Sequence, residues 1–235
     1  MSDIIKQIRS ELLGQVDPVY LRGAQNYFKE GIVLHGVRIP VVRAISARYY
    51  GQTKGLGKEE VFALCDQLLS YDTSEERTIA FDWAWRRRQQ FAASDFRIFE
   101  RWLRDHVNNW GGVDDLCCHP FGYFIEQFPK FLPNVFRWTK AKQWHFRRAA
   151  AVALIYPVRR GKYFRDVLKT ADALRNDEHY LVQKGYGWLL KESYKKFPQE
   201  VFDYVMKNKD RMPRTALRYA IEKMPSAQRK NAMTK

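Results

Sequence analysis

The sequence predicts an all-α protein. Apolar residues recur at intervals of three and four along nearly the whole chain, which is the spacing of amphipathic helices and not of strands. No Asn-Gly or Asp-Gly turn separates alternating apolar runs, so the usual sign of a β-hairpin is missing. Breakers divide the chain into segments of helical length, and about a dozen helices are expected.

The first expected helix lies in residues 1–14, MSDIIKQIRSELLG, where polar residues interrupt the apolar ones as in an amphipathic helix and not as in a signal peptide. Ser74 and Ser94 are expected N-caps of later helices. The remaining boundaries follow the breakers in order: Asp17-Pro18, Ile39-Pro40, residues 51–57, Asp72-Thr73-Ser74, Ser94-Asp95, Gly111-Gly112, Phe128-Pro129 with Pro133, Gly161, Asn176-Asp177, Pro198 and Pro213.

The second half of the chain indicates how the helices are organised. Its segments are spaced like helix pairs of roughly 35–45 residues, the range of HEAT and armadillo units. No linker rich in Pro, Gly or Ser divides the chain, so residues 1–235 are expected to form a single domain, an α-α superhelix (solenoid) of HEAT-like pairs. A compact helical bundle is the alternative. The segments are Phe136–Tyr156, Tyr163–Leu174, Leu181–Tyr194 and Val201–Met206.

The composition indicates in which cellular compartment the protein works and which kinds of partner it binds. The chain has 235 residues, of which 46% are hydrophobic, and 41 basic against 26 acidic residues give a net charge of +15. Such a field attracts polyanions, so nucleic acid is the first partner to consider. Three cysteines cannot form an even disulfide framework, which favours a reducing compartment. The longest apolar run, Ala149–Val158, is about half a membrane span. A cytoplasmic protein without membrane contact is expected.

Basic residues are concentrated within the chain. From Gln127 to Arg165 there are ten Lys and Arg residues and no Asp or Glu. A solvated helix face is the ordinary explanation, but the lack of neutralising residues favours a phosphate-contacting surface. A second pattern is the stripe of Lys184, Trp188, Lys191 and Lys195, which helical spacing places on one face. We interpret this stripe as a tryptophan surrounded by lysines that contact phosphates. The alternative is that the Trp188 side chain packs into the core, while the aliphatic parts of the lysine side chains spread over the surface and keep their charges in water.

Several familiar sites are excluded by inspection. The sequence lacks the His-x-Glu and Cys-x-x-Cys pattern of zinc deaminases and the His-Glu-x-x-His of zincins, and Gly57-Lys58 is followed by Glu59 where a phosphate loop needs Ser or Thr. Cys117-Cys118-His119 is poorly spaced for a tetrahedral metal, so buried cysteines are expected.

The segment from Trp110 to Asp115 remains as a candidate site. Gly111-Gly112 is expected to form a flexible turn, with Asp114 and Asp115 opening the next helix. Helix capping by an aspartate would explain this pattern without any catalytic role.

The order of several short motifs resembles the AlkD-type DNA alkylation repair family. The resemblance extends from about Ala24 to Met224. The motifs are Asn26-Tyr27-Phe28-Lys29, Gly36-Val37-Arg38-Ile39-Pro40-x-x-Arg43, Trp110-x-x-Val113-Asp114, Arg147-Arg148-Ala149-Ala150-Ala151 and Gln183-Lys184-x-x-Gly187-Trp188-x-Leu190-x-Glu192. The family implies a solenoid whose concave basic face holds duplex DNA, and DNA N-glycosylase activity on N3- and N7-alkylated purines in base excision repair.

The resemblance also implies a role for particular residues. Asp114 matches the catalytic aspartate, and Trp110 and Trp188 match the two active-site tryptophans. Because an alkylated purine already carries positive charge, its departure needs no general acid, and a carboxylate that stabilises the cationic sugar suffices. Asp115 is then structural.

DNA-binding residues are expected in both halves of the chain. Arg148 matches an arginine that contacts the backbone beside the lesion, and Tyr27 matches a position that lines the site. Arg38, Arg43, Lys184 and Lys191 are further expected backbone contacts. Ile39, where a polar cap is expected, together with Gly111-Gly112 and Cys117-Cys118-His119, departs from the family pattern.

Two other functions stay open. One is a non-catalytic HEAT-like protein that binds branched or damaged DNA; the joint presence of Asp114 and both tryptophans favours the glycosylase over it. The other is a helical scaffold for an acidic protein, which needs neither residue type. The glycosylase is expected to bind alkylated double-stranded DNA as a monomer, and no cofactor or metal is implied.

Overall fold

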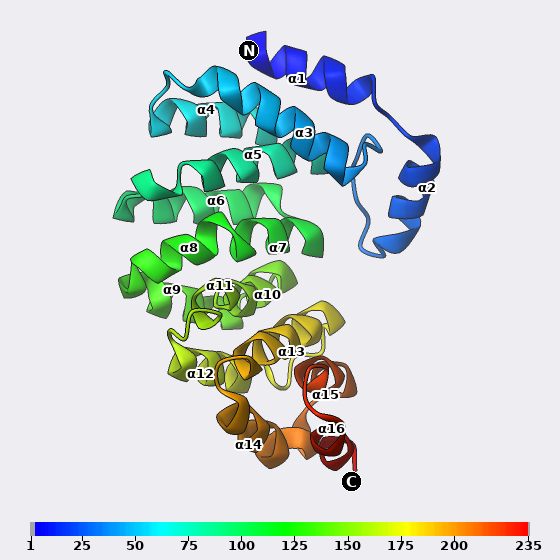
Figure 1. The fold of residues 1–235 in the computed structure, drawn as a ribbon, viewed down its shortest axis with the longest axis vertical. Coiled ribbons are helices and arrows are strands. Elements are labelled where there is room, and N and C mark those ends of the chain that lie inside the picture. The colour runs from blue at the N-terminus through cyan, green and yellow to red at the C-terminus, as the bar shows by residue number, and fades with distance from the viewer. Residues whose placement is uncertain (1–2, 235) are drawn as a thin grey trace. The chain divides into compact units, whose positions relative to one another are not determined.

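The computed structural model describes residues 3–234 and is helical throughout this range, with no strand (Figure 1). Residues 1–2 and 235, which belong to the predicted first helix region and the predicted 1–235 domain, lie outside the described residues. The chain divides into two compact units, Met1–Leu116 and Cys117–Lys235, and each is described by itself. The all-α prediction is confirmed, while the single-domain prediction stays a prediction.

In unit 1, α5 is a central helix (Figure 1). α3 and α4 each pack against α5, and α1 crosses both α3 and α4. Short 3₁₀ turns follow α3 and α5. The helices are α1 (Asp3–Leu13), α2 (Pro18–Tyr27), α3 (Ile39–Tyr50), α4 (Lys58–Leu69), α5 (Ser74–Arg86), α6 (Phe96–His106) and α7 (Trp110–Cys118), and the turns are η1 (Gly51–Thr53), η2 (Arg88–Gln90) and η3 (Ala93–Asp95).

The core of unit 1 is aromatic. Trp83 and Trp102 are fully buried, and each indole N–H has a partner because a buried donor left unpaired is costly. The Trp83 Nε1 donates to the carbonyl of Ser46 at 3.2 Å, and the Trp102 Nε1 donates to Asp66 at 2.6 Å. This core fixes α3, α4, α5 and α6 relative to one another.

α2 differs from its neighbours, because none of its residues is buried. The Asp17 side chain caps the helix by accepting from the backbone N–H groups of Val19 and Tyr20, and Pro18 occupies the first helical position. The Asp17 N–H also donates to the carbonyl of Gly36 at 2.9 Å. Local capping and a few tertiary contacts therefore define the position of α2.

Unit 2 is organised around α13 (Figure 1). α10 and α15 pack against α13, and α12 and α14 also contact it. The helices are α8 (Pro120–Gln127), α9 (Leu132–Arg137), α10 (Trp144–Val152), α11 (Ile155–Val158), α12 (Phe164–Leu174), α13 (Tyr180–Tyr194), α14 (Pro198–Asn208), α15 (Arg214–Ile221) and α16 (Ser226–Met233), with 3₁₀ turns η4 (Pro129–Phe131), η5 (Trp138–Lys140) and η6 (Lys209–Arg211).

Most predicted boundaries agree with the observed helices. Tyr163–Leu174 corresponds to α12, Leu181–Tyr194 to α13, and Val201–Met206 lies inside α14. The expected helix Phe136–Tyr156 is interrupted by η5, so α10 begins only at Trp144. Both N-cap predictions are wrong: Ser74 is the first residue of α5, whose N-cap is Thr73, and Ser94 lies within η3, while the N-cap of α6 is Asp95. Among residues 3–234, no helix has both the length and the apolar character needed to cross a membrane.

Candidate functional site

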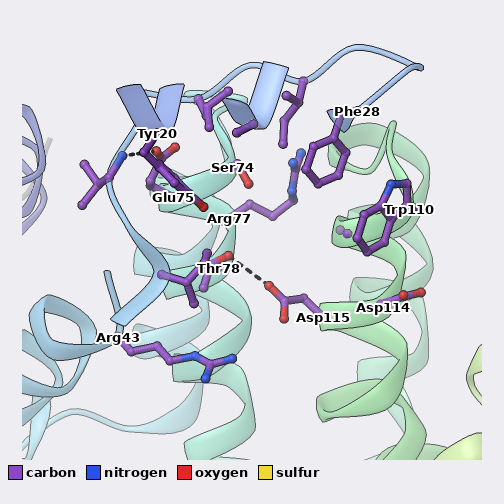
Figure 2. A pocket seen from close by; sticks show the side chains of 17 residues that line it. Tyr20, Phe28, Arg43, Ser74, Glu75, Arg77, Thr78, Trp110, Asp114 and Asp115 are labelled. Carbon is purple, nitrogen blue, oxygen red and sulfur yellow. Dashed lines mark hydrogen bonds between the residues drawn. The ribbon is translucent and has the colours of Figure 1, made fainter. Parts of the chain in front are cut away.

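A cavity of about 280 Å³ lies in unit 1, where α2, the segment after it, α3, α5 and α7 meet (Figure 2). Its walls are largely apolar on the side of residues 32–39 and carry charged groups on the side of α5 and α7. The lining residues are Tyr20, Ala24, Phe28, Ile32, Leu34, Val37, Ile39, Arg43, Ser74, Glu75, Arg77, Thr78, Trp110, Gly111, Gly112, Asp114 and Asp115. The predicted residues Trp110, Asp114 and Arg43 therefore line one cavity.

The prediction of a flexible turn at Gly111-Gly112 is wrong, because both glycines lie in the first turn of α7. The Asn109 Oδ1 accepts from the backbone N–H of Gly112 at 3.0 Å, which satisfies one of the unpaired amides at the start of the helix. Asp114 follows in the second turn and does not open the helix. Gly112 serves close packing, because a Cβ there would lie 3.0 Å from Arg77 Nε, whereas a Cβ on Gly111 would make an ordinary contact 3.4 Å from Phe28 Cε1.

Trp110 and Asp114 are four residues apart on α7, so they lie one helical turn apart on the same face. The neighbouring Asp115 points toward α5, where its carboxylate accepts from Thr78 Oγ1 at 2.9 Å (Figure 2). Figure 2 shows the Asp114 carboxylate on the other side of the helix, below Trp110. Helical geometry thus gives the two adjacent aspartates different surroundings, and Asp115 has the structural contact expected of it.

Three aromatic rings gather at the rim of the cavity. Phe28 stacks on Trp110 with ring centroids 4.8 Å apart and planes 12° from parallel. Tyr27 meets Trp110 edge-on, with centroids 5.8 Å apart. Tyr27 is 69% exposed, so this predicted residue lies at the surface beside Trp110.

The segment that closes the cavity is held by Glu75, which is 2% exposed. Its carboxylate accepts from three successive backbone N–H groups, those of His35 at 3.1 Å, Gly36 at 2.9 Å and Val37 at 3.0 Å. A carboxylate that accepts several amides is strongly held, because each bond is charge-assisted. Glu75 therefore fixes the path of the chain between α2 and α3.

Glu76, the next residue, is also buried and binds the same segment. Its carboxylate contacts His35 Nε2 at 2.9 Å and Arg9 Nε at 3.1 Å, and it accepts from the Thr73 hydroxyl. Burial acts to raise the pKa of Glu76, but the hydrogen bonds from Thr73 and His35 outweigh it and the pKa is lowered. The carboxylate is therefore ionised at neutral pH.

Arg77 is a buried cation beneath the start of α7. It is 3% exposed, and its NH1 donates to the carbonyl of His106, at the end of α6, at 2.9 Å. Burial lowers the pKa of Arg77, and the nearby carboxylates of Asp72, Asp115 and Glu75 act in the opposite direction. The side chain joins α5 to the junction between α6 and α7.

The two predicted DNA-contacting arginines of unit 1 differ in their surroundings. The Arg38 guanidinium forms an ion pair with Asp17. Its Nε donates to Asp17 Oδ2 at 2.9 Å, and its NH2 lies 2.8 Å from the same oxygen. Arg43 is exposed and lines the cavity, and within residues 3–234 no carboxylate lies within ion-pair distance of it. Ile39, expected as a capping position, is instead the first residue of α3, and the cap residue Arg38 makes no side-chain cap.

In unit 2, the stripe of Lys184, Trp188, Lys191 and Lys195 on α13 is held largely by carboxylates. The indole N–H of Trp188 faces Glu192 Oε1 at 3.4 Å, and Lys195 Nζ lies 2.6 Å from Glu192 Oε2. Lys191 pairs with Glu222 at 3.0 Å, whereas Lys184 lies over the ring of Tyr180. Trp188 itself is half-buried.

Arg148 lies inside unit 2, between α10 and α13. It is 5% exposed, and its NH1 donates to the carbonyl of Leu181 at 2.6 Å. Its Cγ lies 3.2 Å from where a Cβ on Gly185 would be, so the glycine makes room for the arginine. The predicted phosphate contact stays a prediction, and the burial adds a packing role for this residue.

The basic block from Gln127 to Arg165 is partly neutralised by acidic residues outside it. Arg147 pairs with Asp177, Arg159 with Glu192, and both Arg160 and Lys162 with Glu126, which directly precedes the block. Arg159, Arg160 and Lys162 are exposed although paired, and the other exposed basic residues of the block are Lys130, Arg137, Lys140, Lys142 and Arg165. Counting charges along the sequence therefore overestimates the net positive charge around this segment in the folded protein.

The three cysteines are buried thiols, as expected. Over the range 3–234, no group of three or more His, Cys, Asp or Glu side chains is arranged to hold a metal ion.

Sequence reasoning passed over four residues that shape these sites: Phe28, Glu75, Arg77 and Glu192. Phe28 and Glu192 lie within motifs that carried the family resemblance, and the spacing of four between Trp188 and Glu192 was a usable signal. Glu75 and Arg77 have no comparable signal in the sequence, because their hydrogen-bond partners lie about 30 to 40 residues away in the chain.

The helix pairs of the two units define an all-α helical-repeat protein, and solved structures share this fold. One is described as a predicted DNA alkylation repair enzyme from Enterococcus faecalis, with a TM-score of 0.77 and 21% identity over 90% of this chain and 98% of that one. Another is AlkD2 from Streptococcus mutans, with a TM-score of 0.57 and 22% identity over 77% of this chain and 89% of that one. The predicted fold class is confirmed.

The family described as DNA alkylation repair enzyme matches residues 8–224, and the chain belongs to this family. Its role therefore lies in DNA repair. Among curated proteins, none matches the sequence significantly.

Proposed function

We propose that this protein is a DNA N-glycosylase that excises positively charged N3- and N7-alkylated purines from duplex DNA, with Asp114 as the catalytic carboxylate. The observation that carries the proposal is the pairing of Trp110 and Asp114 one turn apart on α7, both lining the same cavity. Membership of the DNA alkylation repair family supports it.

The chemistry of such lesions suits this pair. The alkylated base is already a cation, so the glycosidic bond breaks without protonation, and positive charge develops on the deoxyribose. A carboxylate beside the sugar stabilises that charge and orients the attacking water, an electrostatic effect that often dominates catalysis. The electron-rich indole of Trp110 favours a cationic partner by about 0.5–2 kcal/mol, depending on desolvation.

The surroundings of the two aspartates support Asp114 over Asp115. Asp115 accepts a hydrogen bond from Thr78 and faces α5. Asp114 lies on the Trp110 face of α7 (Figure 2). In this proposal Trp188, on α13, provides a second aromatic contact to the substrate, and Arg148, Arg43, Arg38, Lys184, Lys191 and Tyr27 contribute to DNA binding.

The test is the release of free 7-methylguanine and 3-methyladenine from methylated duplex DNA under single-turnover conditions. We expect the wild type to release base and Asp114→Asn to be slower by a factor on the order of 10²–10³, the usual effect of removing one electrostatic stabiliser. Asp115→Asn is the matched control, because it removes a charge one residue away, and it should keep most of the activity.

DNA affinity and thermal stability are measured for each variant, so that a folding defect is not mistaken for a catalytic one. Equal excision by wild type and Asp114→Asn would overturn the assignment of Asp114. Absence of release by every protein, with DNA binding retained, would replace the proposal by a non-catalytic DNA-binding function.

A further inference from the structure

We propose that Phe28 is a positioning residue that holds the Trp110 indole in the orientation in which it meets the substrate. This inference rests on the proposed function for its catalytic consequence. Its geometric part concerns only Phe28 and Trp110.

The contact between the two rings is a parallel stack. Their centroids are 4.8 Å apart and their planes differ by 12°. Such an arrangement leaves one face of the indole covered by Phe28, so a cationic ligand can use the opposite face. Tyr27 meets the indole at 75°, edge-on, and does not fix the plane in the same way.

The backbone defines where the Phe28 ring lies. Phe28 follows the last residue of α2, and its N–H donates to the carbonyl of Ala24 at 3.1 Å. Its own carbonyl accepts from the Gly31 N–H at 2.9 Å. The ring is therefore presented from a hydrogen-bonded helix end and not from an unconstrained loop.

Gly111 lies beside the stack, in the first turn of α7. A Cβ at this position would lie 3.3 Å from Asn109 Oδ1, 3.4 Å from Phe28 Cε1 and 3.5 Å from Phe28 Cζ. The tight neighbour is Asn109 Oδ1, the atom that accepts from the Gly112 N–H, whereas the two distances to Phe28 are those of ordinary van der Waals contact.

Because the stack ties the end of α2 to α7, it also defines one wall of the cavity, which both rings line. Without Phe28, the indole gains access to rotamers that turn it away from the Asp114 side of the helix. Phe28 then acts on the reaction through Trp110 and needs no contact of its own with DNA.

The first experiment tests in solution whether Phe28 stacks on the indole, without using activity. The chain has seven tryptophans, so 5-fluorotryptophan labelling gives a set of ¹⁹F resonances in which Trp110 is assigned by its loss in Trp110→Phe. Phe28→Leu should shift the Trp110 resonance. Phe164→Leu breaks a comparable stack with Phe197, with centroids 4.2 Å apart, and Gly23→Ala fills a position with nothing within 4 Å; both should leave it unchanged.

The second experiment connects the geometry to excision. Phe28→Leu should lower the single-turnover rate by about three- to tenfold, the size expected for an aromatic pair, with little change in DNA affinity, and Phe28→Tyr should restore it. In the Trp110→Leu background, Phe28→Leu should have no further effect, because its partner is already absent.

The outcomes separate the two proposals. An unchanged Trp110 resonance in Phe28→Leu, or rate losses that multiply in the double variant, would overturn the role of Phe28. A wild type that releases no base would overturn the proposed function, while the ¹⁹F comparison would still decide the geometric part.

Discussion

The Arg77 side chain packs against the backbone of Gly112 so closely that a Cβ on the glycine would lie 3.0 Å from Arg77 Nε. The arginine cannot easily move away, because it is 3% exposed and donates to the carbonyl of His106. One contact thus joins α5 to the first turn of α7, the turn that begins with Trp110.

This contact predicts opposite effects for two similar substitutions. Gly112→Ala should lower the free energy of unfolding by about 1 kcal/mol, because crowding against Arg77 exceeds the gain in helix propensity. Gly23→Ala, in α2, has open space around it and should raise the free energy of unfolding by about 0.5–1 kcal/mol. Urea denaturation of both variants checks the prediction. Stabilisation by Gly112→Ala would show that the Arg77 side chain moves away from the added methyl group at little cost in free energy.

The acid stability of unit 2 should depend on Glu192. Burial alone would raise the pKa of Glu192, but hydrogen bonds from Arg159 and Lys195 lower it from 4.5 to about 2. A carboxyl with a lowered pKa stabilises the fold above its unfolded pKa, and this contribution is lost as the pH falls through the folded pKa. Its size is on the order of 1–3 kcal/mol, since the partly exposed cations are screened by solvent.

The stability contribution of Glu192 should therefore be complete at pH 6 and decline between about pH 4.5 and 2. Glu192→Gln should be less stable at pH 6, and its difference from the wild type should shrink over that interval. Thermal unfolding as a function of pH measures this. A difference that stayed constant from pH 6 to pH 2 would argue against the ion pairs with Arg159 and Lys195.

The salt dependence of DNA binding should distinguish Arg43 from Arg38. A cation that contacts a phosphate releases a counterion, so its removal reduces the slope of log K against log salt by about 0.9. Arg43 is exposed and unpaired among the described residues, whereas Arg38 is already bound to Asp17. Arg43→Ala should reduce the slope, and Arg38→Ala should change it less; the reverse order would assign the phosphate contact to Arg38.

Arg148→Ala should act first through folding. The guanidinium donates to Leu181, and the side chain fills the space between α10 and α13. Its loss should cost about 2–4 kcal/mol of stability, from a charged hydrogen bond and a buried void. Lys142→Ala, at an exposed position of the same segment, is the control. Weakened DNA binding by Arg148→Ala at full thermal stability would instead favour a direct phosphate contact.

Local sequence patterns predicted the helices well where capping and periodicity agree, as at Asp17-Pro18 and along α13. They failed at Gly111-Gly112, because glycine pairs usually mark turns and a close tertiary approach leaves no local trace. The same limit applies to the basic block, where Asp177 and Glu192 neutralise arginines about 30 residues away.

The sequence by itself determined the all-α class, the family, and the candidacy of Asp114, Trp110 and Trp188, since these depend on spacing and on motif order along the chain. Only the tertiary structure decided that Phe28 stacks on Trp110, that Asp115 turns to Thr78, and that Arg77 and Glu75 hold the walls of the cavity. The physical reason is that packing and hydrogen-bond pairing join residues far apart in the chain, and no local pattern encodes which ones meet.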